Sequence, residues 1–243
     1  MRWIAPIVVF VLALAALAPA TLIDARLERA SAGRLRLAEA QGTLWSGAGW
    51  IEMRDADGRA GVAKRLAWHV LPESLLRGRL IVQVELDPDG KPFRLSLSLG
   101  RIELADAGIS LPAAALALGL PRLAGLRLSG DVLVTIPQLS IERGRIDGYG
   151  TLQWRGAGSA LTPVSPLGAY EMQFKTVGPA MHAALRTLEG PLQLEGKGAW
   201  SNGEAPSFLG TARVPAQLEE QLSPLFRLIA VERGAGTFEL RLR

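Results

Sequence analysis

The chain has no cysteine and only two histidines among its 243 residues. Without cysteine the protein can form no disulfide bond, no thiolate metal site and no thiol nucleophile. The sequence also lacks the Gly-x-Ser-x-Gly, P-loop, His-Glu-x-x-His and dinucleotide-binding motifs. His69 and His182 lie far apart in the sequence, and His69 stands between Trp68 and Val70, as a structural strand residue would. We therefore expect no enzymatic activity, no metal site and no cofactor.

Long runs of positive charge are absent as well. The formal net charge is +4 and the isoelectric point is near 9.9. The cations are scattered, however, and several adjoin acids, as in Glu142-Arg143 and Glu232-Arg233. Nucleic-acid-binding proteins gather Lys and Arg into patches or runs. We therefore expect no nucleic-acid partner.

Charged residues are also missing from the beginning of the chain. No charged side chain lies between Arg2 and Asp24, and the stretch from Trp3 to Ile23 is almost wholly apolar. A helix of about 20 apolar residues is long enough to cross a hydrocarbon core of about 30 Å. We predict a transmembrane signal anchor over residues 1–23 and a linker over residues 24–33.

A cleaved signal peptide is the alternative for this segment. Ala18-Pro19-Ala20 has the A-x-A form of a cleavage site, and a mature chain beginning at Thr21 would suit a secreted hydrolase. The apolar stretch is nevertheless longer than the ~7–15 residues of an ordinary signal peptide. An uncleaved, single-pass anchor is favoured, with the bulk of the chain outside the cytoplasm.

Apolar and polar residues alternate repeatedly after the anchor. Between 93 and 99 leucine and phenylalanine alternate with arginine and serine, and the ranges 126–136 and 237–243 show the same period of two. This period is typical of strands with one buried face, which antiparallel sheets tolerate. We predict a mainly β protein, in which residues 34–243 form a curved or barrel-like antiparallel domain with a few short helices.

The predicted strands are separated by turn sequences rich in Asp and Gly, such as 55–58, 87–90 and 147–148. The predicted strands cover residues 34–39, 43–54, 63–70, 79–86, 92–104, 125–135, 138–142, 145–155, 169–177, 192–200, 207–214 and 236–243.

Helices are predicted at 72–77, 112–118, 179–188 and 216–231. The first two begin with proline, and Gly190-Pro191 follows the third. In the last, one face carries apolar residues at helical spacing. These residues either seat the helix on the sheet or form a partner-binding stripe, and they are Leu218, Leu222, Phe226 and Ile229.

Three glycine-containing segments end on tryptophan, at 42–45, 150–154 and 196–200. They suggest a repeated hairpin unit, although tryptophan is also simply a common strand residue. We predict that Trp45, Trp154 and Trp200 pack on the same apolar face.

Several distinctive elements follow the N-terminal apolar segment in a fixed order. They are Gly42-Thr43-Leu44-Trp45-Ser46-Gly47, Pro72 with Leu75-Leu76 and Gly78, Pro166-Leu167-Gly168-x-Tyr170, and Gly190-Pro191-Leu192-x-Leu194-x-Gly196-x-Gly198-x-Trp200. A terminal helix, a glycine-containing turn and a last strand complete the order. Over nearly its whole length the chain resembles the type II secretion system protein N family.

The resemblance implies a protein of the inner membrane with a periplasmic domain. Members of that family are accessory parts of the machine that exports folded proteins across the outer membrane. The expected partners are other inner-membrane secretion components and the outer-membrane secretin, and no catalytic residue is implied.

A lipid-related role is the alternative function. An antiparallel sheet with one apolar face must cover that face with a second layer, with its own curvature or with a ligand. An open, curved sheet would form a groove for acyl chains, and such repeated-strand domains behind one anchor resemble the lipid-conduit proteins of the cell envelope. An exposed strand edge would also suit docking by strand addition.

Overall fold

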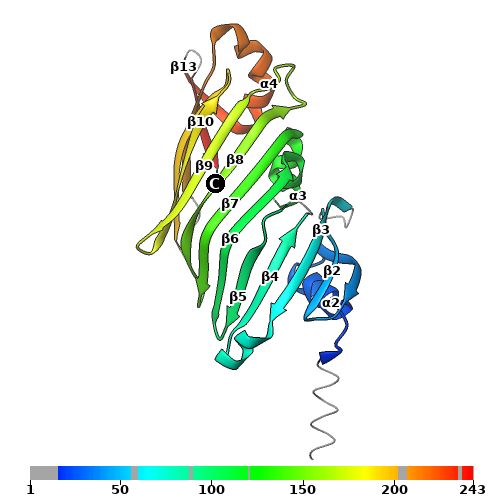
Figure 1. Ribbon diagram of the computed structural model, residues 1–243. Coiled ribbons are helices and arrows are strands. Elements are labelled where there is room, and N and C mark those ends of the chain that lie inside the picture. Colours follow the sequence, from blue (N-terminus) through cyan, green and yellow to red (C-terminus); the bar gives the residue numbers. More distant parts are fainter. Residues whose placement is uncertain are drawn as a thin grey trace, which may run out of the picture. The chain divides into compact units, whose positions relative to one another are not determined.

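The computed structural model describes residues 16–55, 60–87, 90–119, 121–201, 207–234 and 237–242. The chain divides into two compact units, residues 1–99 and 100–243. Antiparallel strands dominate both units, and the helices are few and short (Figure 1). The mainly β, antiparallel fold predicted from the alternating pattern is confirmed.

The first unit contains a sheet whose strands pair in chain order. A helix, α2 (Thr21–Ala30), precedes the sheet, and a 3-10 helix, η1 (Pro72–Arg77), joins its third and fourth strands. The strands are β1 (Leu35–Gly42), β2 (Ser46–Arg54), β3 (Ala60–Leu71), β4 (Leu80–Leu86) and β5 (Phe93–Ser98).

Helix α2 covers the outer edge of β1. The backbone N–H of Leu37 donates to Asp24 Oδ1 at 2.8 Å, and that of Leu35 donates to the Ser31 hydroxyl oxygen at 2.9 Å. Asp24 also forms an ion pair with Arg36. Free N–H groups along an edge strand would otherwise invite pairing with another chain. The edge of β1 is therefore closed to strand addition at these positions.

Residues just before α2 belong to the folded unit. Pro19 forms a β-bridge with Thr43, and Ala20 is buried against Leu37 and Trp68. Of the predicted anchor, residues 1–15 lie outside the described part of the chain, and most of the predicted linker is helix α2. Within the described ranges, no helix combines the length and the apolarity needed to cross a membrane.

The second unit contains a sheet in the order β6-β7-β8-β9-β10-β11-β12-β14-β13. Its strands are β6 (Arg101–Pro112), β7 (Leu128–Glu142), β8 (Arg145–Ser159), β9 (Gly168–Val177), β10 (Ala180–Glu189), β11 (Gln193–Ser201), β12 (Ser207–Arg213), β13 (Ala230–Gly234) and β14 (Thr237–Leu242). Its helices are η2 (Ala113–Ala115), α3 (Leu116–Gly119), η3 (Pro121–Leu126), η4 (Ala216–Leu218) and α4 (Glu219–Ile229).

The sheets are open. Among the described strands, β1 does not pair with β5 in the first unit, and β6 does not pair with β13 in the second. The barrel-like form that the sequence left possible is therefore wrong. An open sheet leaves edge strands and a face that no barrel wall encloses.

The helix predicted at 179–188 is wrong, because this segment is strand β10. Its apolar residues Met181, Leu185 and Leu188 fit a helical spacing, but Met181 and Leu185 also fit a period of two with Ala183 between them. Gly178, with φ +64°, turns the chain tightly after β9, so the segment returns as its antiparallel neighbour.

Strand β7 joins two predicted strands, 125–135 and 138–142, into one. Pro137 lies in its interior and lacks the N–H that a regular ladder needs. The pairing with β8 shifts between Thr135 and Gln138. This irregularity accommodates the proline without ending the strand.

Candidate functional site: an apolar face of the second unit

Strand β9 begins with four buried residues and alternates in burial from Met172 to Val177. Tyr170 is buried and Met172 and Phe174 are half-buried, whereas Gln173 and Lys175 are exposed. In an antiparallel sheet, directly opposed residues project from the same face. Register can therefore be used to follow the apolar side of β9 across its neighbours.

This apolar side continues over β7, β8, β10 and β11, and we refer to it as the apolar face. Every member is buried or half-buried. The register aligns Val132, Val134, Leu152, Trp154, Tyr170, Met172, Phe174, Met181, Ala183, Leu185, Leu194 and Trp200.

One end of the apolar face is covered by helix α4. Leu222 is 0% exposed and forms the centre of a buried cluster, against which Leu194 of the apolar face packs. The cluster consists of Leu126, Leu167, Leu192, Ala212, Val214, Leu222, Leu225 and Phe226. Of the predicted helix residues, Leu222 and Phe226 lie in this cluster and Leu218 packs against it; the side chain of Ile229 lies outside the described part.

Tyr170 is fixed at this covered end. Its phenol donates to the backbone carbonyl oxygen of Leu192 at 3.0 Å. Burial raises the pKa of the Tyr170 phenol, so the hydroxyl stays protonated as a donor. The ring centroid lies 5.8 Å from that of Trp154, in a tilted arrangement. Tyr170 thus ties the Pro166–Tyr170 element to Leu192 of the Gly190–Trp200 element.

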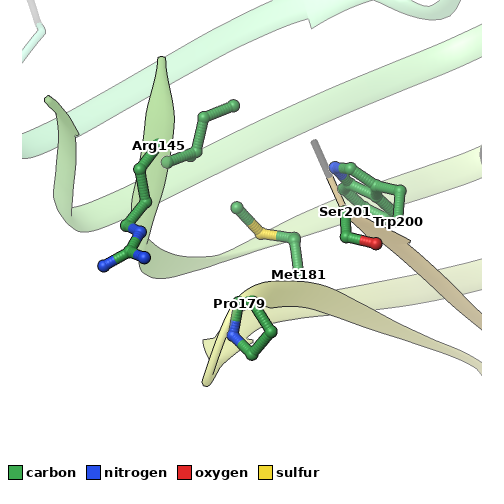
Figure 2. Close-up of a pocket in the computed structure, with 6 residues that line it drawn as sticks. Arg145, Pro179, Met181, Trp200 and Ser201 are labelled. Atoms are coloured by element: carbon green, nitrogen blue, oxygen red, sulfur yellow. The ribbon is translucent and has the colours of Figure 1, made fainter. Parts of the chain in front are cut away.

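A small pocket lies at the opposite end of the apolar face. Arg145 and Ile146 from β8, Pro179 from the turn before β10, Met181 and the end of β11 line it, and Figure 2 shows Met181 between Arg145 and Trp200. Its volume is about 170 Å³. Arg145 and Ser201 make part of its lining polar, so the pocket is not a closed apolar cavity.

Glycines leave room for aromatic rings against neighbouring strands. A Cβ atom at Gly150 would lie 2.6 Å from Phe174 Cζ, and one at Gly196 would lie 2.5 Å from Phe208 Cζ. Such distances are far below van der Waals contact. The Gly-x-Gly spacing of the Gly190–Trp200 element therefore makes room for the ring of Phe208.

The other face of the sheet is polar and is organised by Glu171. This side chain is 6% exposed. It accepts hydrogen bonds from Gln153 (3.0 Å), Gln173 (2.7 Å) and the guanidinium of Arg186 (2.7 and 3.0 Å). The amides of Gln153 and Gln173 and the Arg186 guanidinium hold the pKa of the Glu171 carboxyl below its usual value. These bonds stabilise three neighbouring strands and leave Glu171 poorly placed for chemistry.

The Gly42–Gly47 element forms the turn between β1 and β2. The Thr43 hydroxyl oxygen accepts the N–H groups of Trp45 and Ser46, and Trp68 Nε1 donates to the carbonyl oxygen of Leu44 at 3.2 Å. A Cβ atom at Gly47 would lie 2.5 Å from the Trp68 ring. The element is therefore explained by packing, and its own Trp45 is half-buried.

The predicted tryptophans separate into the two units. Trp154 and Trp200 lie on the apolar face of the second unit, and Trp45 belongs to the first. The pocket residues Arg145, Pro179 and Ser201 were not predicted. The alternation of residues 180–189 is the signal that would have placed Met181 on a strand of this face.

The described residues contain no group of three or more His, Cys, Asp or Glu side chains suited to a metal ion. The family model described as type II secretion system, protein N, matches residues 33–241. No curated protein and no solved structure matches the chain.

Proposed function

Because the chain belongs to the protein N family of the type II secretion system, we propose that it is an accessory component of that machine in the inner membrane. Its β-rich part lies in the periplasm and contributes to the export of folded proteins across the outer membrane. Its partners are other inner-membrane secretion components and the outer-membrane secretin.

The observation that carries this proposal is the family match over residues 33–241, which includes strands of both units. The sequence supports the membrane location through the uncharged stretch between Arg2 and Asp24. Residues of the motifs on which the resemblance rests have packing roles. Gly47 leaves room for the Trp68 ring, and Gly196 leaves room for the Phe208 ring. These motifs therefore support membership of the family through the fold, and they do not identify the residues that bind a partner.

Edge strand β13 is the element best placed to dock a partner by strand addition. It is the last strand in the sheet order of the second unit, and β14 is its one neighbour among the described strands. An unpaired backbone edge can accept a strand from another protein. The edge of β1, in contrast, is occupied by Asp24 and Ser31 of the α2 region.

Membrane location and orientation can be tested on the full-length protein in its own cells. We expect the protein to stay with the inner membrane after carbonate extraction and to be digested by protease added to spheroplasts. Release by carbonate would contradict the anchor. Protection from protease until the cells are lysed would contradict a periplasmic β domain.

Lipid binding is the second candidate function, and the apolar face is the observation that favours it. Helix α4 covers one end of this face, while Leu152, Met172 and Leu185 in its middle are half-buried. When a ligand removes apolar side-chain area from water, the complex is stabilised by about 25 cal/mol per Å².

The lipid-binding candidate predicts that phospholipid purifies with the protein. Leu152→Asn should lower the amount of bound lipid measured by mass spectrometry, because it places an amide on the apolar face. Thr151→Asn is the matched control, since Thr151 is opposite Gln173 on the polar face. Equal lipid in both variants, or none in the wild type, would rule this candidate out.

A further inference from the structure

The connection between β3 and β4 is built to hold a short helix rigidly. Ser74 in η1 is buried; its hydroxyl donates to the carbonyl oxygen of Leu71 at 2.6 Å and accepts the N–H of Ile81 at 3.0 Å. Pro72 begins the helix, and Gly78 ends it with φ +67°, a conformation that favours glycine. The helix is thus fixed to both strands.

This helix presents leucines to solvent. Leu75 is 42% exposed and Leu76 is 91% exposed, although apolar side chains of this size are usually buried. Arg77 and Arg79 follow and are also exposed. Ser74 points inward, so the leucine pair points outward. Two adjacent leucines beside two cations have the composition of a membrane-surface contact.

Strand register places η1 at the same end of the first unit as the start of the described chain. Ser46 is opposite His69, near the end of β3, and Pro19 is bridged to Thr43, in the turn before Ser46. In Figure 1 the cyan turn between β3 and β4 and the blue start of the described chain both lie toward the lower side of this unit.

Further exposed leucines lie at this end. Leu17 is 75% exposed and precedes the bridge, and Leu44 lies in the turn that the bridge contacts. Leu99 is fully exposed and follows β5, whose Leu97 is opposite Leu80 at the start of β4. The opposite end of β4 leads into the polar loop that contains Lys91. Most of the exposed large apolar residues described in the first unit therefore lie at one end; Trp50, in the middle of β2, is the exception.

The amino-acid sequence before this end is apolar and uncharged from Trp3 onward. We propose that Leu75, Leu76, Arg77 and Arg79 form a second membrane contact, in which the leucines enter the interface of an anionic phospholipid bilayer and the arginines bind its headgroups. This contact rests on the proposed inner-membrane anchor. It would fix the first unit at the membrane surface through a folded element in addition to the N-terminal segment.

The absence of cysteine makes the contact measurable with a single probe. Leu76→Cys in the full-length protein, labelled with an environment-sensitive fluorophore, is reconstituted into vesicles of phosphatidylethanolamine and phosphatidylglycerol that carry a lipid-bound quencher. Lys91→Cys is the matched control, because Lys91 is exposed in the same unit but lies roughly 25 Å away along the sheet. Leu99→Cys is a second probe at the proposed contact.

We expect quenching at positions 76 and 99 to exceed quenching at position 91 by about twofold or more, because interfacial side chains enter the headgroup region. Equal quenching at 76 and 91 in membrane-bound protein would overturn the contact. Failure of the labelled proteins to float with the vesicles would instead contradict the membrane anchor. The two failures are therefore distinguishable.

The charge contribution has its own test. Arg77→Gln with Arg79→Gln should reduce quenching at position 76 in vesicles that contain phosphatidylglycerol, since each cation near an anionic surface strengthens binding. Glu73→Gln is the control for a change of charge in the same helix. An unchanged signal in the arginine double variant would contradict headgroup binding by these residues.

Discussion

Gly150 shows at the scale of one residue why glycine recurs in these strands. A Cβ atom there would lie 2.6 Å both from Phe174 Cζ and from the backbone carbonyl oxygen of Thr135. The side chain of Phe174 could move aside, but the carbonyl is backbone and belongs to Thr135, which pairs with Thr151 between β7 and β8. Gly150 therefore permits both the sheet pairing and the position of the aromatic ring.

We predict that Gly150→Ala lowers the free energy of unfolding by about 1–3 kcal/mol, the usual cost of overpacking. Gly108→Ala is the control, because nothing lies within 4 Å of its Cβ position. Urea unfolding of both variants measures the difference. If Gly108→Ala lowered the free energy of unfolding as much as Gly150→Ala, the steric explanation would be contradicted.

Glu171 gives a pH-dependent contribution to stability. Hydrogen bonds from Gln153, Gln173 and Arg186 lower its pKa in the folded state. The stabilisation is therefore present above the pKa of the unfolded chain and is lost as the pH falls through the lower, folded-state pKa.

We predict that Glu171→Gln lowers the free energy of unfolding at pH 7 by roughly 1–3 kcal/mol, the range for hydrogen bonds to a charged group. The difference between wild type and variant should shrink as the pH falls below the ordinary range of a glutamate. Urea unfolding from pH 7 to pH 3 measures it. A difference that does not change over this range would contradict the assigned role of the carboxylate.

At the scale of the element, helix α2 acts as an edge cover. Asp24 accepts the N–H of Leu37 and forms an ion pair with Arg36. The hydrogen bonds from Arg36 and from the Leu37 N–H lower the pKa of the Asp24 carboxyl. Ser31 accepts the next outward N–H, that of Leu35.

We predict that Asp24→Ala combined with Ser31→Ala exposes the β1 edge and promotes self-association, since unpaired edge strands template pairing. Light scattering of detergent-solubilised full-length protein measures the effect. Asp24→Asn is the control, because its amide oxygen can still accept the Leu37 N–H. Equal association in the control and in the double variant would show that charge, and not the open edge, is responsible.

Helix α4 is attached to its sheet through Leu222. We predict that Leu222→Ala lowers the free energy of unfolding by about 2–5 kcal/mol, because a fully buried leucine leaves a cavity. Leu209→Ala, at an exposed leucine on β12, should change it little. Thermal or urea unfolding compares the two. A small effect at Leu222 would contradict its place at the centre of the buried cluster.

Local patterns predicted most of the strands and the last helix. They missed β10 and β13, whose first residues fall within the helix predicted at 216–231, and they joined β5 and the start of β6 into one strand over 92–104. Alternation identified β5, β7 and β14, and the helical spacing of Leu218, Leu222 and Phe226 identified η4 and α4. Local patterns failed where two periods coincide, as at Met181 and Leu185 in β10. There the antiparallel pairing with β9 decides the structure, and a single segment does not contain that information.

At the scale of the whole molecule, the sequence predicted the family and the fold class but only part of the candidate site. Trp154 and Trp200 were selected from the sequence, and both lie on the apolar face. Arg145 and Pro179 were not selected, because the pocket exists only where the ends of three strands come together. For the same reason the sequence could not decide between a barrel and an open sheet, since closure depends on pairing between the first and last strands.

The central claim is that this protein is part of the type II secretion machine. The measurement that tests it most directly is cross-linking of the tagged full-length protein in native membranes, followed by purification and mass spectrometry, with untagged membranes as control. We predict recovery of inner-membrane secretion components or the outer-membrane secretin above the control. Recovery of lipid or lipid-export proteins without any secretion component would contradict the claim.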